Sequence, residues 1–276
     1  MGKRVEITRN LGYERNFLVE TVDEAEVMIG KLHGVGKRKY QQDAFGISET
    51  MDRSAVEEKG ILTVLADGMG GLADGEKISM TVVVSFLSYF DEHMPAEDPT
   101  EEMKDILFEA NRRVNELLGR RSGESGSTVA AALFKDKKVS WITVGDSRIY
   151  LYKEGKITQL SKDHNYARRL EEMVEAGEIT EEEARKDPQR DALTSYIGAG
   201  EEIEEMDFGA VPLELGGGDK IILMSDGVYH SLTEEEMAES MKLSVEKAAM
   251  QLGMKIEEKR KKNQDNYTAV IVEMKE

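Results

Sequence analysis

The sequence predicts an α+β protein in which layers of β-sheet are covered by helices. Apolar runs of strand length gather in separate stretches of the 276-residue chain, and amphipathic helical patterns gather between and after them. This grouping favours α+β over a regular alternation of one strand with one helix. No internal repeat or low-complexity linker divides the sequence, so we expect a single domain over residues 1–276.

The first half of the chain supports this class with four strands followed by two helices. Short apolar runs predict the strands. They cover residues 16–22, 27–29, 44–47 and 61–66. Apolar side chains then recur every three or four residues through 78–90 and 103–118, which predicts two helices with one buried face each.

The second half repeats the theme, with more strands and then more helices. Polar turns at 135–138 and at Gly145-Asp146 separate the next apolar runs. The predicted strands cover residues 129–134, 139–144, 149–152, 220–224 and 267–272. The predicted helical stretches cover residues 165–187, interrupted at Gly177, then 233–241 and 244–260.

Composition excludes several classes of protein. The formal net charge of −18 opposes binding to nucleic acid. The absence of cysteine excludes disulfides, zinc–thiolate sites and thiol nucleophiles. No run approaches the roughly 20 apolar residues of a membrane helix, and the N-terminus lacks the apolar core of a signal peptide. We therefore expect a cytoplasmic protein with no membrane or nucleic-acid partner.

Aspartates at strand boundaries are the strongest chemical signal. Asp67 and Asp226 each follow an apolar strand and precede glycine, while Asp43, Asp146 and Asp265 stand at other strand ends. One interpretation is that Asp-Gly merely marks a turn. The other is that the carboxylates meet at one sheet edge, where only a hard cation such as Mg²⁺ or Mn²⁺ would offset their repulsion. Two such ions a few ångströms apart make a phosphoester hydrolase site.

Seven short motifs occur in the order and approximate spacing of one protein family. They are Gly36–Ala44, Ala66–Gly71, Gly126–Thr128, Val144–Arg148, Ser161–His164, Ser225–Gly227 and Gln264–Thr268. Together they resemble the metal-dependent protein phosphatases, in the bacterial form of the type 2C serine/threonine phosphatases, over residues 30–274. The resemblance implies a four-layer α-β-β-α sandwich, with a central antiparallel β-sandwich flanked by helices on both faces. It also implies hydrolysis of phosphoserine and phosphothreonine in phosphoprotein substrates of a serine/threonine kinase.

The same resemblance implies two Mn²⁺ or Mg²⁺ ions and a weaker third site. Asp67 would bridge the two ions, and the Gly68 carbonyl would bind the second. Asp226 and Asp265 would bind the first ion. Asp146, together with Asp226, would form the third site.

Other residues would act around these ions. By the same resemblance, Asp43 would hold a coordinated water, and Arg38 would grip the substrate phosphate, which suits its planar fork of donors. A hydroxide bridging the two ions would attack phosphorus in line. Glutamate often precedes the residue equivalent to Asp43 and binds the second ion, but this chain has Gln42 there. Either the neutral amide coordinates more weakly, or Gln42 points to solvent and another group completes the shell.

The resemblance also assigns a flap segment, and it leaves the N-terminal segment and two alternative functions open. Residues 165–192 match the family's flap, whose glutamates form either an ordinary solvated face or a filter favouring basic phosphopeptides. Residues 1–29 lie outside the resemblance and are expected to add strands. The rivals are a catalytically weakened member that binds phosphoproteins without hydrolysing them, and a dimetal hydrolase of small phosphoesters.

Overall fold

The computed structural model describes most of the chain. The described residues are 17–23, 27–48, 52–69, 74–93, 98–209 and 211–275. Asn16 of the first predicted strand lies outside them, as do residues 1–15 and 24–26 of the N-terminal segment and the motif glycines Gly70 and Gly71.

The described strands form two antiparallel sheets. The first has the strand order β1-β2-β13-β12-β8-β9. Its strands are β1 (Phe17–Asp23), β2 (Val27–Gly34), β13 (Tyr267–Met274), β12 (Lys220–Met224), β8 (Arg148–Lys153) and β9 (Lys156–Gln159). Both predicted N-terminal strands are confirmed, since β2 pairs with β1 along one edge and with β13 along the other.

The second sheet has the order β10-β7-β6-β4-β3, with two short strands attached beside it. Its strands are β10 (Asp207–Phe208), β7 (Lys138–Val144), β6 (Val129–Lys135), β4 (Ile61–Met69) and β3 (Asp43–Ile47), with β5 (Gly126–Ser127) beside β4 and β11 (Leu213–Glu214) beside β7. The two-residue strands β5, β10 and β11 were not predicted, because so short a segment has no periodicity of its own.

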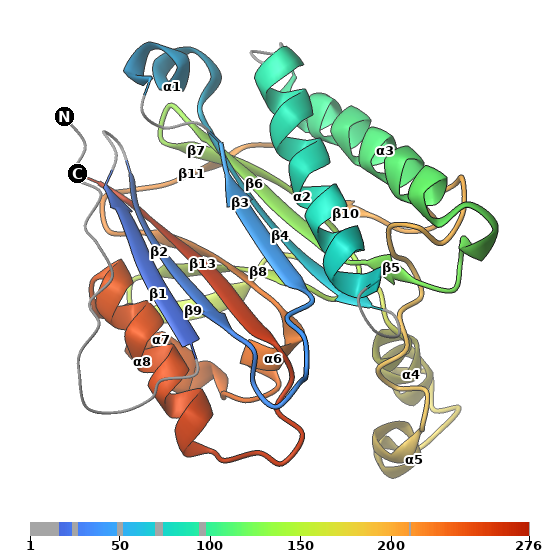
Figure 1. Ribbon diagram of the computed structural model, residues 1–276. Coiled ribbons are helices and arrows are strands. Elements are labelled where there is room, and N and C mark those ends of the chain that lie inside the picture. The colour runs from blue at the N-terminus through green and yellow to red at the C-terminus, as the bar shows by residue number, and fades with distance from the viewer. Residues whose placement is uncertain are drawn as a thin grey trace.

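Three apolar layers hold four structural layers together. Leu65 and Ile149 belong to the core between the sheets. Phe86 of α2 (Asp74–His93) packs with α3 (Pro99–Leu118) on the second sheet. Leu252 of α8 (Val245–Glu258) packs with α7 (Glu234–Met241) on the first sheet. Figure 1 shows these helix pairs on the two outer faces, which confirms the predicted α-β-β-α sandwich.

Local signals explain where the helices begin. The Asp98 carboxylate accepts hydrogen bonds from the backbone N–H groups of Thr100 and Glu101, and Pro99 occupies the first turn of α3. Capping boxes start α5 (Glu181–Lys186) and α7 at Thr180 and Thr233. The short helices α1 (Arg53–Lys59) and α6 (Asp226–Tyr229) carry too few residues for a helical pattern and were not predicted.

The predicted flap contains two helices that project from the sandwich. Helix α4 (Tyr166–Glu175) and α5 lie apart from the other layers in Figure 1. The backbone N–H of Tyr166 donates to the carbonyl of Ala192, which closes the base of this excursion. The single-domain assignment and the flap assignment remain predictions. Within the described residues, none of the helices has the length and apolar character needed to cross a bilayer.

Candidate active site

Strand pairing brings the first two predicted aspartates together. Asp43 opens β3 and lies directly opposite Asp67 near the end of β4. Residues opposite each other in an antiparallel pair project to the same face of the sheet. The two carboxylates therefore belong to one site.

The Gly126–Thr128 motif fixes the backbone of Asp67. The Thr128 hydroxyl accepts from the Asp67 N–H at 3.0 Å, and the Thr128 N–H donates to the Asp67 carbonyl at 2.9 Å. The Ser127 hydroxyl donates to the same carbonyl at 3.0 Å. With its N–H and carbonyl both bonded, Asp67 has a fixed backbone from which its side chain projects.

The glycines after Asp67 and Asp226 serve close packing and do not form turns. Gly68 continues β4, and Gly227 lies within α6. A Cβ on Gly68 would lie 2.1 Å from the Gly75 carbonyl oxygen, and one on Gly227 would lie 1.9 Å from the Asn266 carbonyl oxygen. The interpretation of Asp-Gly as a turn signal is therefore wrong at both positions, although Gly145, with φ of +94°, is a turn glycine.

Asp43 is buried, and only one of its two carboxylate oxygens accepts hydrogen bonds. Its Oδ2 accepts from the Ser225 hydroxyl at 2.8 Å and from the Thr268 hydroxyl at 2.6 Å. Its Oδ1 is buried without a hydrogen-bond partner. Burial raises the pKa of Asp43 to about 7, with help from Asp226 and Asp265, against the opposing effect of the two hydroxyl bonds.

Burial and neighbouring carboxylates also raise the pKa values of Asp67 and Asp146. Burial raises the pKa of Asp67 well above its ordinary value, and Asp43, Asp226, Asp146 and Asp265 raise it further. Burial, followed by the charge of Asp226, raises the pKa of Asp146 to about 7. The structure thus places the five predicted aspartates close enough to repel one another.

This donor set fits a hard divalent cation in its chemistry. Asp226 Oδ1, like Asp43 Oδ1, is a buried carboxylate oxygen without a hydrogen-bond partner. Mg²⁺ and Mn²⁺ bind carboxylate oxygens, and their positive charge offsets the repulsion between neighbouring carboxylates. The distances between the carboxylates fit a metal site less well than their chemistry does. Among the described residues, no three His, Asp or Glu side chains stand close enough together to hold one ion.

Arg38 is paired with one of the predicted metal ligands. Its Nη2 donates to Asp265 Oδ2 at 2.5 Å, so a guanidinium neutralises one of the predicted metal ligands. The bond to Asp265 raises the pKa of Arg38. Asn266 holds the Arg38 loop, because its Nδ2 donates to the carbonyls of Val35 and Tyr40 at 2.9 and 3.1 Å.

Gln42 lies between these elements. Its backbone N–H donates to Asn266 Oδ1 at 2.8 Å, and its carbonyl accepts from the Gly68 N–H at 3.0 Å. Its side-chain amide packs on Gly75, where an added Cβ would lie 2.1 Å from Gln42 Nε2 and 2.8 Å from the Gly68 carbonyl oxygen. The amide and the Gly68 carbonyl therefore lie on the same side of Gly75.

Hydrogen bonds and a cation–π contact stabilise the segment around Asp146, and these contacts were not predicted. The Tyr229 hydroxyl donates to the Asp146 carbonyl at 2.8 Å, and the Arg148 guanidinium lies 3.7 Å from the centre of the Tyr229 ring. Arg148 also binds Asp163 through two nitrogens. His164 accepts from the Gly145 N–H through Nδ1 at 3.1 Å, which anchors the turn before Asp146.

Most of these supporting residues lie inside the quoted motifs, which were the available signal, whereas Tyr229 lies two residues beyond the motif Ser225–Gly227. Their partners could not be inferred, because each contact joins distant parts of the chain. Thr268 is an example: its hydroxyl bonds both Asp43 and His33 Nδ1, 225 and 235 residues away in the sequence.

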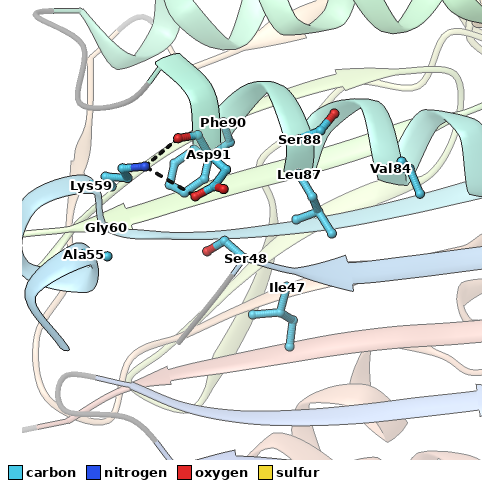
Figure 2. A pocket seen from close by; sticks show the side chains of 10 residues that line it. All are labelled: Ile47, Ser48, Ala55, Lys59, Gly60, Val84, Leu87, Ser88, Phe90 and Asp91. Carbon is cyan, nitrogen blue, oxygen red and sulfur yellow. Dashed lines mark hydrogen bonds and ion pairs between the residues drawn. The ribbon is translucent and has the colours of Figure 1, made fainter. Parts of the chain in front are cut away.

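A separate cavity of about 370 Å³ lies at the other end of β3 and contains none of the predicted site residues. Figure 2 shows it between Ile47, helix α1 and the last turns of α2, with Lys59 bonded to Asp91 at one side. Asp43 and Ile47 stand at opposite ends of the five-residue strand, roughly 13 Å apart at 3.3 Å per residue. The cavity is therefore not assigned to the active site.

The raised pKa values predict how stability depends on pH. In chelator, the free energy of unfolding should fall as pH rises from about 4 to about 7, because folded Asp43 and Asp146 (pKa about 7) retain protons that the unfolded chain has released (ordinary value 3.8). We expect a decrease on the order of a few kcal/mol. Urea unfolding at pH 5 and 7.5 measures it. Asp146→Asn should have the shallower pH dependence, and identical slopes would contradict the burial of this charge.

The chain belongs to the protein phosphatase 2C family, whose sequence model matches residues 33–258. The serine/threonine protein phosphatase PstP of Mycobacterium tuberculosis is 29% identical over 200 residues, which are 72% of this chain and 37% of PstP. Protein phosphatase PhpP of Streptococcus pneumoniae is 31% identical over 179 residues, 64% of this chain and 70% of PhpP. This chain thus spans little more than a third of the length of PstP.

Structural comparison agrees with the family assignment. The crystal structure of the catalytic domain of PstP in complex with two manganese ions matches this chain with a TM-score of 0.72 and 25% sequence identity. The match covers 91% of this chain and 99% of that domain.

Proposed function

We propose that this chain removes phosphate from phosphoserine and phosphothreonine in proteins with the help of two Mn²⁺ or Mg²⁺ ions. The observation that carries the proposal is that four aspartate carboxylates lie close enough to Asp67 to raise its pKa, with Arg38 bonded to one of them, Asp265. Family membership and the two manganese ions in the PstP structure support the same activity. When bound, the cations would lower the pKa of water and stabilise negative charge on the phosphoryl group.

The proposed metal ligands are Asp67, the Gly68 carbonyl, Gln42, Asp226 and Asp265, with Asp146 and Asp226 at a weaker third site. The backbone bonds from Ser127 and Thr128 would keep Asp67 in place during turnover. Ser225 and Thr268 fix one oxygen of Asp43, which leaves Oδ1 to accept a hydrogen bond from a coordinated water.

Arg38 would bind the substrate phosphate. Its guanidinium is about half exposed and already bonded to a carboxylate, whose planar pair of oxygens resembles two oxygens of a phosphoryl group. Binding the phosphate requires Arg38 to exchange Asp265 for the substrate. A cation at Asp265 would favour that exchange, because it would take over the neutralisation of this carboxylate.

Phosphate release from a phosphothreonine peptide tests the proposal. Release should require Mn²⁺ or Mg²⁺ and stop in chelator. Binding of the phosphopeptide without release would favour the phosphoprotein-binding rival. Release from small phosphoesters alone, with no release from peptides, would favour the small-molecule rival.

Gln42→Glu should tighten Mn²⁺ binding and raise activity at low metal concentration. The amide lies on the same side of Gly75 as the Gly68 carbonyl, and affinity for hard cations rises with the number of charged ligands. Calorimetric Mn²⁺ titration of wild type and Gln42→Glu measures the effect. Gln189→Glu, which adds the same charge at an exposed flap position, is the control. Superimposable titrations of wild type and Gln42→Glu would show that Gln42 is not a ligand.

A further inference from the structure

A group of exposed basic residues borders the candidate active site. Two segments supply it: the loop between β2 and β3, and the loop that follows α8. We define the basic rim as Lys37, Lys39, Arg260, Lys261 and Lys262, all of which are exposed. The chain as a whole carries a formal charge of −18, so five exposed basic side chains in two neighbouring segments differ from its average composition.

Backbone contacts hold the two segments side by side. The Lys37 N–H donates to the Gln264 carbonyl at 2.8 Å. Gly36, with φ of +60°, packs so closely on Asp265 that a Cβ would lie 2.2 Å from the Asp265 carbonyl oxygen. Figure 1 shows the β2–β3 loop and the α8–β13 loop next to each other at one end of the sandwich. Arg38 also pairs with Asp265 across these two segments, so Lys37 and Lys39 adjoin the proposed phosphate-binding residue, while Arg260, Lys261 and Lys262 lie a few residues before Asp265 in the chain.

The charge of the rim is largely uncompensated. Within the described part of the chain, Lys37, Lys39, Arg260 and Lys262 form no ion pair with a carboxylate, and Lys261 donates to the His230 carbonyl. The neighbouring Lys259 differs, because its Nζ lies 2.6 Å from Glu236 Oε1, and it is therefore left out of the rim.

Three glutamates of the acidic flap are paired with basic residues of the flap itself. Glu171 pairs with Arg190 at 3.3 Å, Glu172 with Arg168 at 3.5 Å, and Glu182 with Lys186 at 2.5 Å. These pairs neutralise three of the seven flap glutamates, and each such exposed pair contributes little to stability. The interpretation of the flap as a filter for basic phosphopeptides therefore remains a separate prediction.

We propose that the basic rim selects substrates whose phosphorylated residue lies in an acidic segment of polypeptide. The inference rests on the proposed phosphatase function, since Arg38 would hold the phosphate while the rim contacts the flanking residues. Lys37 and Lys39 are the chain neighbours of Arg38, so the acidic side chains they meet belong to residues close to the phosphorylated one. Exposed positive charges beside a binding site raise the local concentration and the association rate of acidic ligands, and salt screens the effect.

Binding of three fluorescent peptides tests the proposal. Each carries a non-hydrolysable phosphonate analogue of phosphothreonine, flanked by acidic, neutral or basic residues. Wild type should bind the acidic peptide about tenfold more tightly than the neutral one at low salt, since the contributions of several exposed charge pairs add to about that factor. The preference should shrink in 0.5 M NaCl. Equal Kd values for the acidic and neutral peptides would overturn the proposal.

Reversing the charge of rim residues tests whether the rim causes the preference for the acidic peptide. Lys39→Glu combined with Lys262→Glu should abolish the preference for the acidic peptide and leave turnover of a small phosphomonoester unchanged. The control combines Lys137→Glu in the β6–β7 turn with Lys247→Glu at the start of α8, exposed positions outside the rim. An equal loss of preference in the control would assign the effect to net charge and overturn the role of the rim.

The readouts separate this inference from the proposed function. Kd values are obtained without turnover, so they test the rim even in an inactive protein. Hydrolysis of the matching phosphothreonine peptides tests the function. Equal hydrolysis and equal binding of all three peptides would overturn the inference alone, whereas acid-selective binding without hydrolysis of any phosphopeptide would overturn the function alone.

Discussion

Asp67→Asn is expected to abolish phosphatase activity while stabilising the protein in chelator. Loss of a group one shell beyond a metal ligand already costs about 10- to 100-fold, so loss of a bridging ligand should cost more than about 100-fold. Without a cation, Asp67 is an unfavourable charge, because burial and four neighbouring carboxylates raise its pKa. A neutral amide removes that cost. The free energy of unfolding should therefore rise in chelator.

Phosphopeptide turnover and urea unfolding in chelator measure the two effects. A third measurement is the shift of the thermal midpoint on adding Mn²⁺, which should be large in wild type and nearly absent in Asp67→Asn. The matched control is Asp105→Asn on the exposed face of α3, which should change none of the three. Full turnover in Asp67→Asn would remove Asp67 from the site, and loss of turnover accompanied by loss of stability would indicate a folding defect.

Arg38→Ala should lower kcat/KM for phosphopeptides by on the order of 100-fold and raise KM, because the phosphate loses a charged donor with two parallel N–H groups. The same change should tighten Mn²⁺ binding, since Asp265 would lose the guanidinium that neutralises it in the structure. Opposite effects on catalysis and metal affinity distinguish this role from general damage to the site.

Arg38→Lys is the conservative variant for this test. It keeps the charge but not the planar fork, so it should recover only part of kcat/KM. Phosphopeptide kinetics and calorimetric Mn²⁺ titration of both variants supply the measurements. An unchanged kcat/KM in Arg38→Ala would exclude Arg38 from substrate binding.

Regular patterns in the sequence predicted the larger elements well. The apolar runs predicted β4, β6, β7, β12 and β13, and the helical periodicity predicted α2, α3, α7 and α8. Each of these elements buries one or both faces against a neighbouring layer. Its apolar residues therefore recur at the period of a strand or a helix, and this period can be recognised in the local sequence. Short elements such as α6 depend on what packs around them and were not predictable in this way.

The sequence by itself determined the layered α+β class and the family motifs, and it predicted the oxygen donors proposed for the site, because these depend on residue type and local spacing. Only the tertiary structure decided which groups meet. It paired Asp43 with Asp67, bonded Arg38 to Asp265, and placed the loop after α8 beside the Arg38 loop. It also assigned Gly68 to close packing inside a strand that continues past the expected turn. These contacts join residues far apart in the chain, and they form only where the packing of both sheets brings distant strand ends and loops together.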